Sequence, residues 1–142
     1  MIYLGADHAG YLLKEQIKQF LSKEKIKFQD LGTHNNIDSV DASDYAMKVA
    51  KKIKKQDKGI LICGSGIMMS MAANRIKGVR AALAWNEKIA QQAREHNDAN
   101  ILVLSGRESS PKNWKKIIHV FLKTKFSKKQ KYLKRIKKLD HI

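Results

Sequence analysis

Residues 59–74, GILICGSGIMMSMAAN, join an uninterrupted apolar run to a glycine-rich turn and then to a segment rich in helix-forming residues. A continuous apolar run is typical of a central strand in a parallel sheet, because helices cover both faces of such a strand. The stretch predicts a buried strand over 59–63, a tight turn and a helix over 68–76. Cys63, the single cysteine of the chain, stands where this strand ends.

The same alternation continues on both sides of this stretch. Ser43 is expected to cap the second helix, and Ser110 followed by Pro111 to begin the fifth. The whole pattern predicts one α/β domain over 1–142, a three-layer, doubly wound, Rossmann-like five-stranded parallel sheet with a basic helical tail at about 127–142. Further strands are expected at 2–5, 26–32, 79–85 and 100–106, and further helices at 13–21, 45–53, 87–96, 112–123 and 132–139.

The charge of the chain is concentrated in its tail. The formal net charge is +16, and the residues from Pro111 onward hold 12 Lys or Arg against the single acid Asp140. Lys predominates over Arg, whereas nucleic-acid surfaces rely on Arg for base contacts. We interpret the tail as a solvated basic face, and affinity for a phosphorylated small substrate or for a polyanion is the alternative.

Other classes of protein are disfavoured by composition. No apolar run approaches the roughly 18–20 residues that span a bilayer, so no membrane association is expected. The start, MIYLGADHAG, lacks the features of a signal peptide, and one cysteine forms no internal disulfide, so a reducing cytoplasm is expected. One cysteine with scattered histidines is not a zinc pattern, and no metal is expected.

Candidate chemistry gathers at one edge of the expected sheet. Ligands of such sheets bind beyond the carboxyl ends of the strands. Three polar segments stand at such ends: ADHAG at 6–10, CGSG at 63–66 and SGR at 105–107. The segment REHNDAN at 94–100 precedes a strand and does not follow from this rule.

The thiol itself has several interpretations. A lone cysteine is most often a small buried hydrophobe. A thiol phosphatase needs Arg six residues after the cysteine, where this chain has Met69. Dinucleotide fingerprints match poorly, because GADHAG places Asp7 where a glycine admits the pyrophosphate. The remaining chemistry is a thiolate general base beside a turn whose backbone amides bind an oxyanion.

Three motifs, GADHAG at 5–10, GILICGSGIMMSMAANRIKGVRAA at 59–82 and REHNDAN at 94–100, resemble the ribose-5-phosphate isomerase type B family, which includes galactose-6-phosphate isomerase subunits. The resemblance runs in order from residue 2 to about 110 and more loosely through the tail. It implies isomerisation of ribose 5-phosphate and ribulose 5-phosphate through a cis-enediolate, without metal or cofactor. Cys63 favours the ribose-phosphate enzyme, because one galactose-6-phosphate subunit typically lacks this cysteine.

The resemblance also implies roles for individual residues. Cys63 would move the proton between C1 and C2, and Ser65 would carry a proton between the two oxygens. His96 would open the sugar ring as an acid, helped by Asp7. A homodimer with shared sites, possibly a tetramer, would bring the segment 94–100 to the thiol. The implied substrate-binding residues are His8, the amides of Gly64, Gly66, Ile67 and Met68, then Asn97, Arg107, Lys131 and Arg135.

Four departures from the family pattern leave alternatives open. Met68 replaces a glycine, and its amide remains a donor if its backbone is helical but is strained if φ is positive. Ala42-Ser43 replaces Tyr-Pro, Lys131 replaces Arg, and Tyr132 replaces a nearby His. A six-carbon substrate, galactose or allose 6-phosphate, is one alternative, and a non-catalytic relative that binds nucleic acid through the tail is another. On a purely structural interpretation, Asp7 and His8 only shape a turn and His96 only ends a helix.

Overall fold

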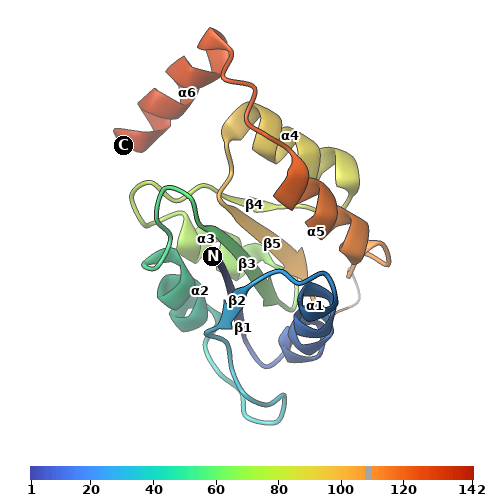
Figure 1. Cartoon of the computed structure of the whole chain (residues 1–142). Coiled ribbons are helices and arrows are strands. Elements are labelled where there is room, and N and C mark those ends of the chain that lie inside the picture. The colour runs from blue at the N-terminus through green and yellow to red at the C-terminus, as the bar shows by residue number, and fades with distance from the viewer. Residues whose placement is uncertain (108–109) are drawn as a thin grey trace.

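Strands and helices alternate along the chain in a computed structural model that describes residues 1–107 and 110–142 (Figure 1). The strands are β1 (Ile2–Ala6), β2 (Phe28–Asp30), β3 (Lys58–Cys63), β4 (Ala81–Leu83) and β5 (Ile101–Ser105). The helices are α1 (Tyr11–Lys23), α2 (Ala42–Ala50), α3 (Ile67–Ala73), α4 (Glu87–Asn97), α5 (Trp114–Lys123) and α6 (Gln130–Asp140). In the described residues, no helix is long and apolar enough to cross a membrane.

The five strands form one parallel sheet in the order β2-β1-β3-β5-β4, which confirms the predicted fold class. The predicted strands 26–32 and 79–85 shorten to three residues each, β2 and β4. Both lie at the edges of the sheet and pair on one side only, whereas β1, β3 and β5 pair on both sides. The chain leaves β1 toward β2 on one side and later continues from β3 on the other. The strand order therefore reverses between β1 and β3.

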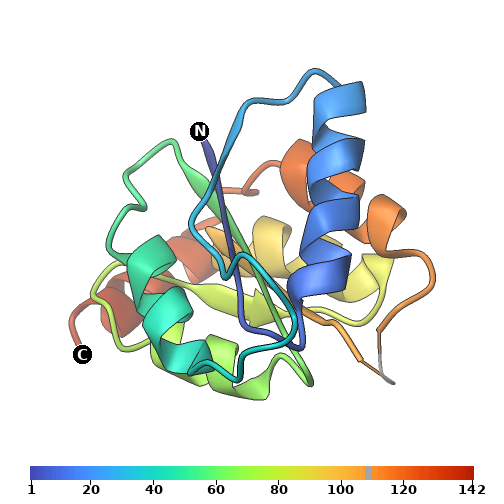
Figure 2. The same ribbon diagram turned by 90° about the horizontal axis from the view of Figure 1, so that it is seen from below.

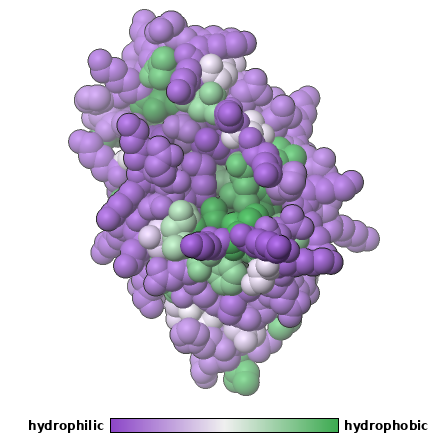
Figure 3. Space-filling model, viewed as in Figure 1, coloured by the Kyte–Doolittle hydropathy of each residue, from purple (hydrophilic) through white to green (hydrophobic). Residues whose placement is uncertain are grey.

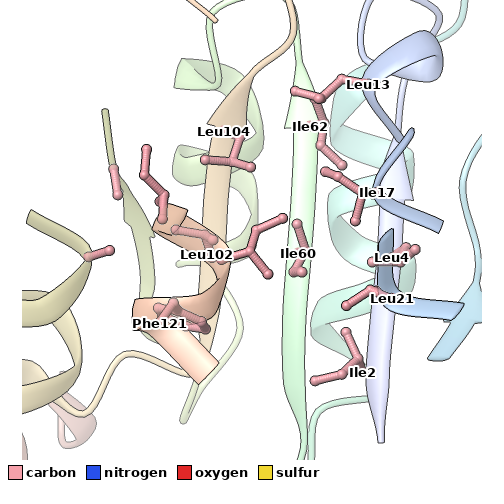
Figure 4. Close-up of a cluster of buried hydrophobic side chains, with 14 of the residues drawn as sticks. Ile2, Leu4, Leu13, Ile17, Leu21, Ile60, Ile62, Leu102, Leu104 and Phe121 are labelled. Carbon is pink, nitrogen blue, oxygen red and sulfur yellow. The ribbon is translucent and has the colours of Figure 1, made fainter. Parts of the chain in front are cut away.

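Helices cover both faces of the sheet, so the fold has three layers (Figure 2). Along β3, Ile60 and Ile62 pack with α1, α4 and α5, in the core drawn in Figure 4. Leu61 and Cys63 point to the other face and pack with α2 and α3. This two-residue alternation places the thiol on the face of α2 and α3.

Two predicted helix starts are wrong. α2 begins at Ala42, and its cap is Asp41, whose Oδ1 accepts from the Ser43 N–H at 2.8 Å. Ser43 therefore lies inside the first turn, because the carboxylate two residues before it satisfies its free amide. α5 begins only at Trp114, since Pro111 lies in a preceding turn whose carbonyl accepts from the Trp114 N–H at 3.2 Å.

The last helix, α6, makes few contacts with the rest of the chain. It contains no buried residue and packs beside α4 (Figure 1). At its C-terminal end, the two Nη1 contacts from Arg80 to the Asp140 carboxylate are both 3.0 Å. At its other end, Tyr132 packs on α4. Just before α6, the Ser127 N–H also donates to the Glu95 carbonyl of α4 at 3.1 Å, so the tail is attached at both ends of α6.

Candidate active site

The strand-order reversal between β1 and β3 locates the binding crevice. Ligands of open α/β sheets bind where the connections that follow two neighbouring strands run in opposite directions. The loop after β1 lies directly against the end of β3. The Asp7 N–H donates to the Ile62 carbonyl at 3.3 Å. A Cβ at Gly10 would overlap the Ile62 backbone, so only glycine permits this approach. The fold thereby brings residues 7–10 and 63–66 together.

Asp7 and His8 are both held by backbone groups. Asp7 is 7% exposed, and its Oδ1 accepts from the Gly10 N–H at 2.9 Å. Asp7 therefore does shape the turn before α1. The Nδ1 of His8 accepts from the Val40 N–H at 3.1 Å. Because this bond needs an unprotonated Nδ1, a neutral His8 ring carries its hydrogen on Nε2 and is a donor there.

Cys63 is 4% exposed, and its sulfur has a polar partner. The Gly66 N–H donates to the Cys63 Sγ at 3.1 Å. Gly66 has a left-handed backbone, with φ of +84°, and a Cβ there would lie 2.5 Å from the Leu83 Cδ1. The turn therefore requires glycine, and its reversal aims an amide at the sulfur. A hydrogen bond of this kind strengthens when its acceptor carries negative charge.

The amides after Cys63 are divided between two uses. Besides the Gly66 amide, the Ile67 N–H has a partner inside the turn, the Ser65 Oγ at 3.3 Å. In the described part of the chain, the amides of Gly64, Ser65 and Met68 make no hydrogen bond. Met68 lies in α3 and is absent from the described residues with positive φ, so its backbone is helical and unstrained. Of the amides of residues 64–68, these three are the donors left for an oxyanion.

Arg107 lies beside the same turn. Its N–H donates to the Gly64 carbonyl at 3.2 Å, and the Ser105 Oγ donates to that carbonyl at 2.6 Å. A Cβ at Gly64 would lie 3.4 Å from the Arg107 Cδ and 3.6 Å from its Nη1. The Arg107 side chain therefore lies within van der Waals distance of the turn, and its exposed guanidinium supplies a positive charge at the rim of the crevice.

His96 and Asn97 lie at the opposite end of the sheet, where the strands begin. They end α4, and the Asn100 carbonyl just after them accepts from the Gly59 N–H at 2.8 Å, at the start of β3. Four residue steps along β3 separate Gly59 from Cys63, about 13 Å. A histidine side chain does not span that length. One chain therefore does not bring His96 to the thiol.

A second group of residues, His96, Lys131, Tyr132 and Arg135, lies together at this end of the sheet. The rings of His96 and Tyr132 are stacked, with centroids 4.6 Å apart and planes 19° apart. The Lys131 Nζ lies 4.9 Å and the Arg135 Cζ 5.8 Å from the centroid of the Tyr132 ring. Sequence reasoning assigned Tyr132 no role. The available signal was an aromatic residue beside Lys131 and one turn before Arg135 on the same helix.

A cavity of about 610 Å³ adjoins the second group, between residues 74–82 and the end of α6. Figure 3 shows a patch of apolar surface near the middle of the face seen in Figure 1, bordered by hydrophilic residues. Asn97 lines the cavity, together with Ile76 and Val79. No group of three or more His, Cys, Asp or Glu in residues 1–107 and 110–142 is arranged to hold a metal ion.

Comparison with known proteins matches nearly the whole chain to one family. A family model described as Ribose/Galactose Isomerase matches residues 2–139. A probable ribose-5-phosphate isomerase B of Mycoplasma genitalium is 43% identical over 128 residues, which cover 88% of this chain and 84% of the relative. The crystal structure of a Thermotoga maritima ribose 5-phosphate isomerase is similar at 43% identity and a TM-score of 0.94, covering 99% of this chain and 97% of that one. The Mycoplasma genitalium isomerase B structure with bound ribulose 5-phosphate is similar at 40% identity and a TM-score of 0.92, covering 99% and 93%.

Proposed function

The chain belongs to the ribose/galactose isomerase family of sugar-phosphate isomerases, and we propose that it interconverts D-ribose 5-phosphate and D-ribulose 5-phosphate. The observation that carries this proposal is the Cys63 sulfur at the strand-order reversal, with the Gly66 amide 3.1 Å from it. The ribulose 5-phosphate bound by a similar protein supports the choice of sugar. The reaction is a step of the pentose phosphate pathway, and we place it in the cytoplasm, where a lone thiol stays reduced.

In the proposed mechanism, the Cys63 thiolate removes the proton from C2 of the open-chain aldose. The electrons form a double bond between C1 and C2, and the negative charge collects on the oxygens as a cis-enediolate. The thiol returns the proton to C1, which yields the ketose. The Ser65 hydroxyl carries a proton between the oxygens on C1 and C2. The amides of Gly64, Ser65 and Met68 are the donors for the enediolate, and one such donor contributes about 3 kcal/mol.

The other predicted residues act before and around this step. His96 protonates the ring oxygen of the furanose as the ring opens. The second oxygen of Asp7, whose Oδ1 holds the turn, assists this opening. The Nε2–H of His8 donates to the substrate, and Asn97 binds sugar hydroxyls. Three cations, Arg107, Lys131 and Arg135, bind the phosphate.

These residues act together only if two copies of the chain share each site. The separation of Cys63 and His96 along β3 supports a homodimer in which each copy supplies one half of the site. The N-terminal part of α3, next to the thiol turn, exposes Ile67, Met68 and Met71, which favours burial against another copy. A two-fold axis would create two equivalent sites. A tetramer formed from two such dimers is compatible with this arrangement.

The direct test is formation of ribulose 5-phosphate from ribose 5-phosphate, with a chelator present. We expect the wild type to turn over. Cys63→Ala and the isosteric Cys63→Ser should lower kcat about 100- to 10,000-fold, because each removes the thiolate base. Circular dichroism verifies the fold of both variants. Turnover by Cys63→Ala at the wild-type rate would exclude the thiol as base, and loss of wild-type activity with chelator would exclude the metal-free mechanism.

The family description favours a second candidate substrate, a six-carbon sugar phosphate. Ala42 at the start of α2 is small, so it is compatible with a larger sugar. Turnover of galactose 6-phosphate and allose 6-phosphate, compared with ribose 5-phosphate, distinguishes the two candidates. We expect a higher kcat/KM for the five-carbon substrate. Nucleic-acid binding is not proposed, since Lys131 and Arg135 of the basic tail are assigned to the substrate phosphate.

A further inference from the structure

We propose that Tyr132 is a positioning residue that holds His96, Lys131 and Arg135 in one fixed arrangement. Its consequence for catalysis rests on the proposed function, whereas the arrangement itself does not. On its own chain, Tyr132 contacts His96 and not the residues around Cys63. It acts through the three side chains that it touches.

The orientation of His96 depends on the tyrosine ring. The two rings are nearly parallel, with centroids 4.6 Å apart. Among the described residues, neither nitrogen of the His96 ring has a hydrogen-bond partner. The stack therefore fixes the plane of the imidazole and leaves both nitrogens available to a sugar ring.

The same tyrosine ring gathers the two cations. The Lys131 Nζ at 4.9 Å and the Arg135 Cζ at 5.8 Å both lie within the range in which a cation is attracted to the face of an aromatic ring. Both side chains are otherwise exposed and carry long flexible stems. Their attraction to Tyr132 restricts where the charges lie relative to His96. The acid and the two phosphate-binding charges thus share one organising ring.

Tyr132 also fixes the arm that carries it. α6 has no buried residue, and its ion pair with Arg80 lies at the far end, at Asp140. Near the substrate-binding residues, the stack on His96 joins α6 itself to α4, and just before α6 the Ser127 N–H donates to the Glu95 carbonyl of α4 at 3.1 Å. Loss of the ring would release the imidazole and both cations together.

The interaction uses the face of the ring rather than the hydroxyl. In the described residues, the Tyr132 hydroxyl makes no hydrogen bond. Tyr132→Phe should therefore preserve the arrangement, and Tyr132→Leu, which is apolar and favours helix, should remove it. This pair separates an aromatic role from a purely hydrophobic one.

The first measurement is independent of activity. In the full-length protein, the Tyr132 ring current should shift the carbon-bound ring protons of His96 upfield in the NMR spectrum, with assignment from a His96→Gln variant. We expect this shift in the wild type and in Tyr132→Phe, and its loss in Tyr132→Leu. A His96 spectrum unchanged in Tyr132→Leu would overturn the arrangement, whatever the enzyme does.

The second measurement is kinetic, with ribose 5-phosphate. Tyr132→Leu should lower kcat/KM about tenfold, through both a lower kcat from His96 and a higher KM from the cations, while Tyr132→Phe stays within about twofold. Urea unfolding controls for a general loss of stability. Wild-type kinetics in Tyr132→Leu, or equal losses in Phe and Leu, would overturn the positioning role. An inactive wild type would refute the proposed function instead, and the NMR comparison would still decide the arrangement.

Discussion

Gly66 combines a left-handed backbone with a tight contact, and both bear on the thiol. The Gly66→Ala substitution meets φ of +84° and a Cβ position 2.5 Å from the Leu83 Cδ1. We expect a loss of about 2–3 kcal/mol in the free energy of unfolding, since backbone strain alone accounts for about 1–2 kcal/mol. We also expect kcat to fall, because the amide that faces the sulfur is displaced. Urea unfolding and the isomerase assay measure both effects.

Gly78 offers a matched control for this prediction. Its φ is +79°, yet a Cβ there meets no described atom within 4 Å. Gly78→Ala should cost only the backbone strain and leave kcat unchanged. Equal losses of stability and activity in the two variants would show that the packing of the thiol turn is irrelevant.

His8 is expected to act as a neutral donor, because the Val40 N–H occupies its Nδ1 at 3.1 Å. His8→Gln retains a donor near the position of Nε2, whereas His8→Ala removes it. We expect His8→Ala to raise KM about tenfold or more, and His8→Gln to raise it less, since a lost hydrogen bond to a charged group costs about 1.5–3 kcal/mol. Nitrogen NMR of the wild type should find the hydrogen on Nε2. A hydrogen on Nδ1 would refute this orientation.

At the scale of elements, a buried ion cluster joins α1 to β2. Lys14 is only 1% exposed and pairs with Asp30 and Glu15, and Lys18 pairs with the same two carboxylates. Burial of the Asp30 carboxyl opposes its ionisation, but hydrogen bonds from Lys14, Gly32 and Lys18 outweigh this effect and lower its pKa. Asp30→Asn should cost about 1.5–3 kcal/mol of stability, because the buried lysine loses one of its two charged partners and keeps Glu15.

The same cluster predicts how stability changes with pH. Because the pKa of Asp30 is lower in the folded state, its contribution is complete above the unfolded value of about 3.9 and is lost as the pH falls through the folded pKa. Urea unfolding should show a steeper acid loss in the wild type than in Asp30→Asn. Parallel acid profiles would refute the assignment. Lys14→Met, which leaves Asp30 paired with Lys18, should cost less than Asp30→Asn.

Sequence patterns predicted that the residues of one half of the proposed site lie together, because that half obeys a local rule. Cys63 ends a buried strand and Asp7 and Arg107 follow one, and parallel strands place such residues at the same end of the sheet. The helix starts at Ala42 and Trp114 were missed because several polar residues in each loop were plausible caps. The contact of His96 with Tyr132 depends on α6 folding back onto α4. A contact between residues so far apart in the sequence leaves no periodic pattern in the sequence.

At the scale of the whole molecule, the two halves of the proposed site lie at opposite ends of the strands of one sheet. A single copy holds the thiol turn with His8 and Arg107 at one end, and His96 with the Tyr132 group at the other. Within one chain, the length of β3 from Gly59 to Cys63, about 13 Å, separates the two halves. Under the proposed function, a second copy of the chain completes the site, so the activity of each copy should depend on its partner.

Mixing two inactive variants measures this dependence directly. Cys63→Ala and His96→Ala, each inactive alone, are combined, unfolded and refolded as one sample, then assayed with ribose 5-phosphate. If each site takes its thiol from one copy and its acid from the other, random pairing restores intact sites to about a quarter of the wild-type activity. Activity that stays at the level of the separate variants would contradict a shared site built around the Cys63 thiolate.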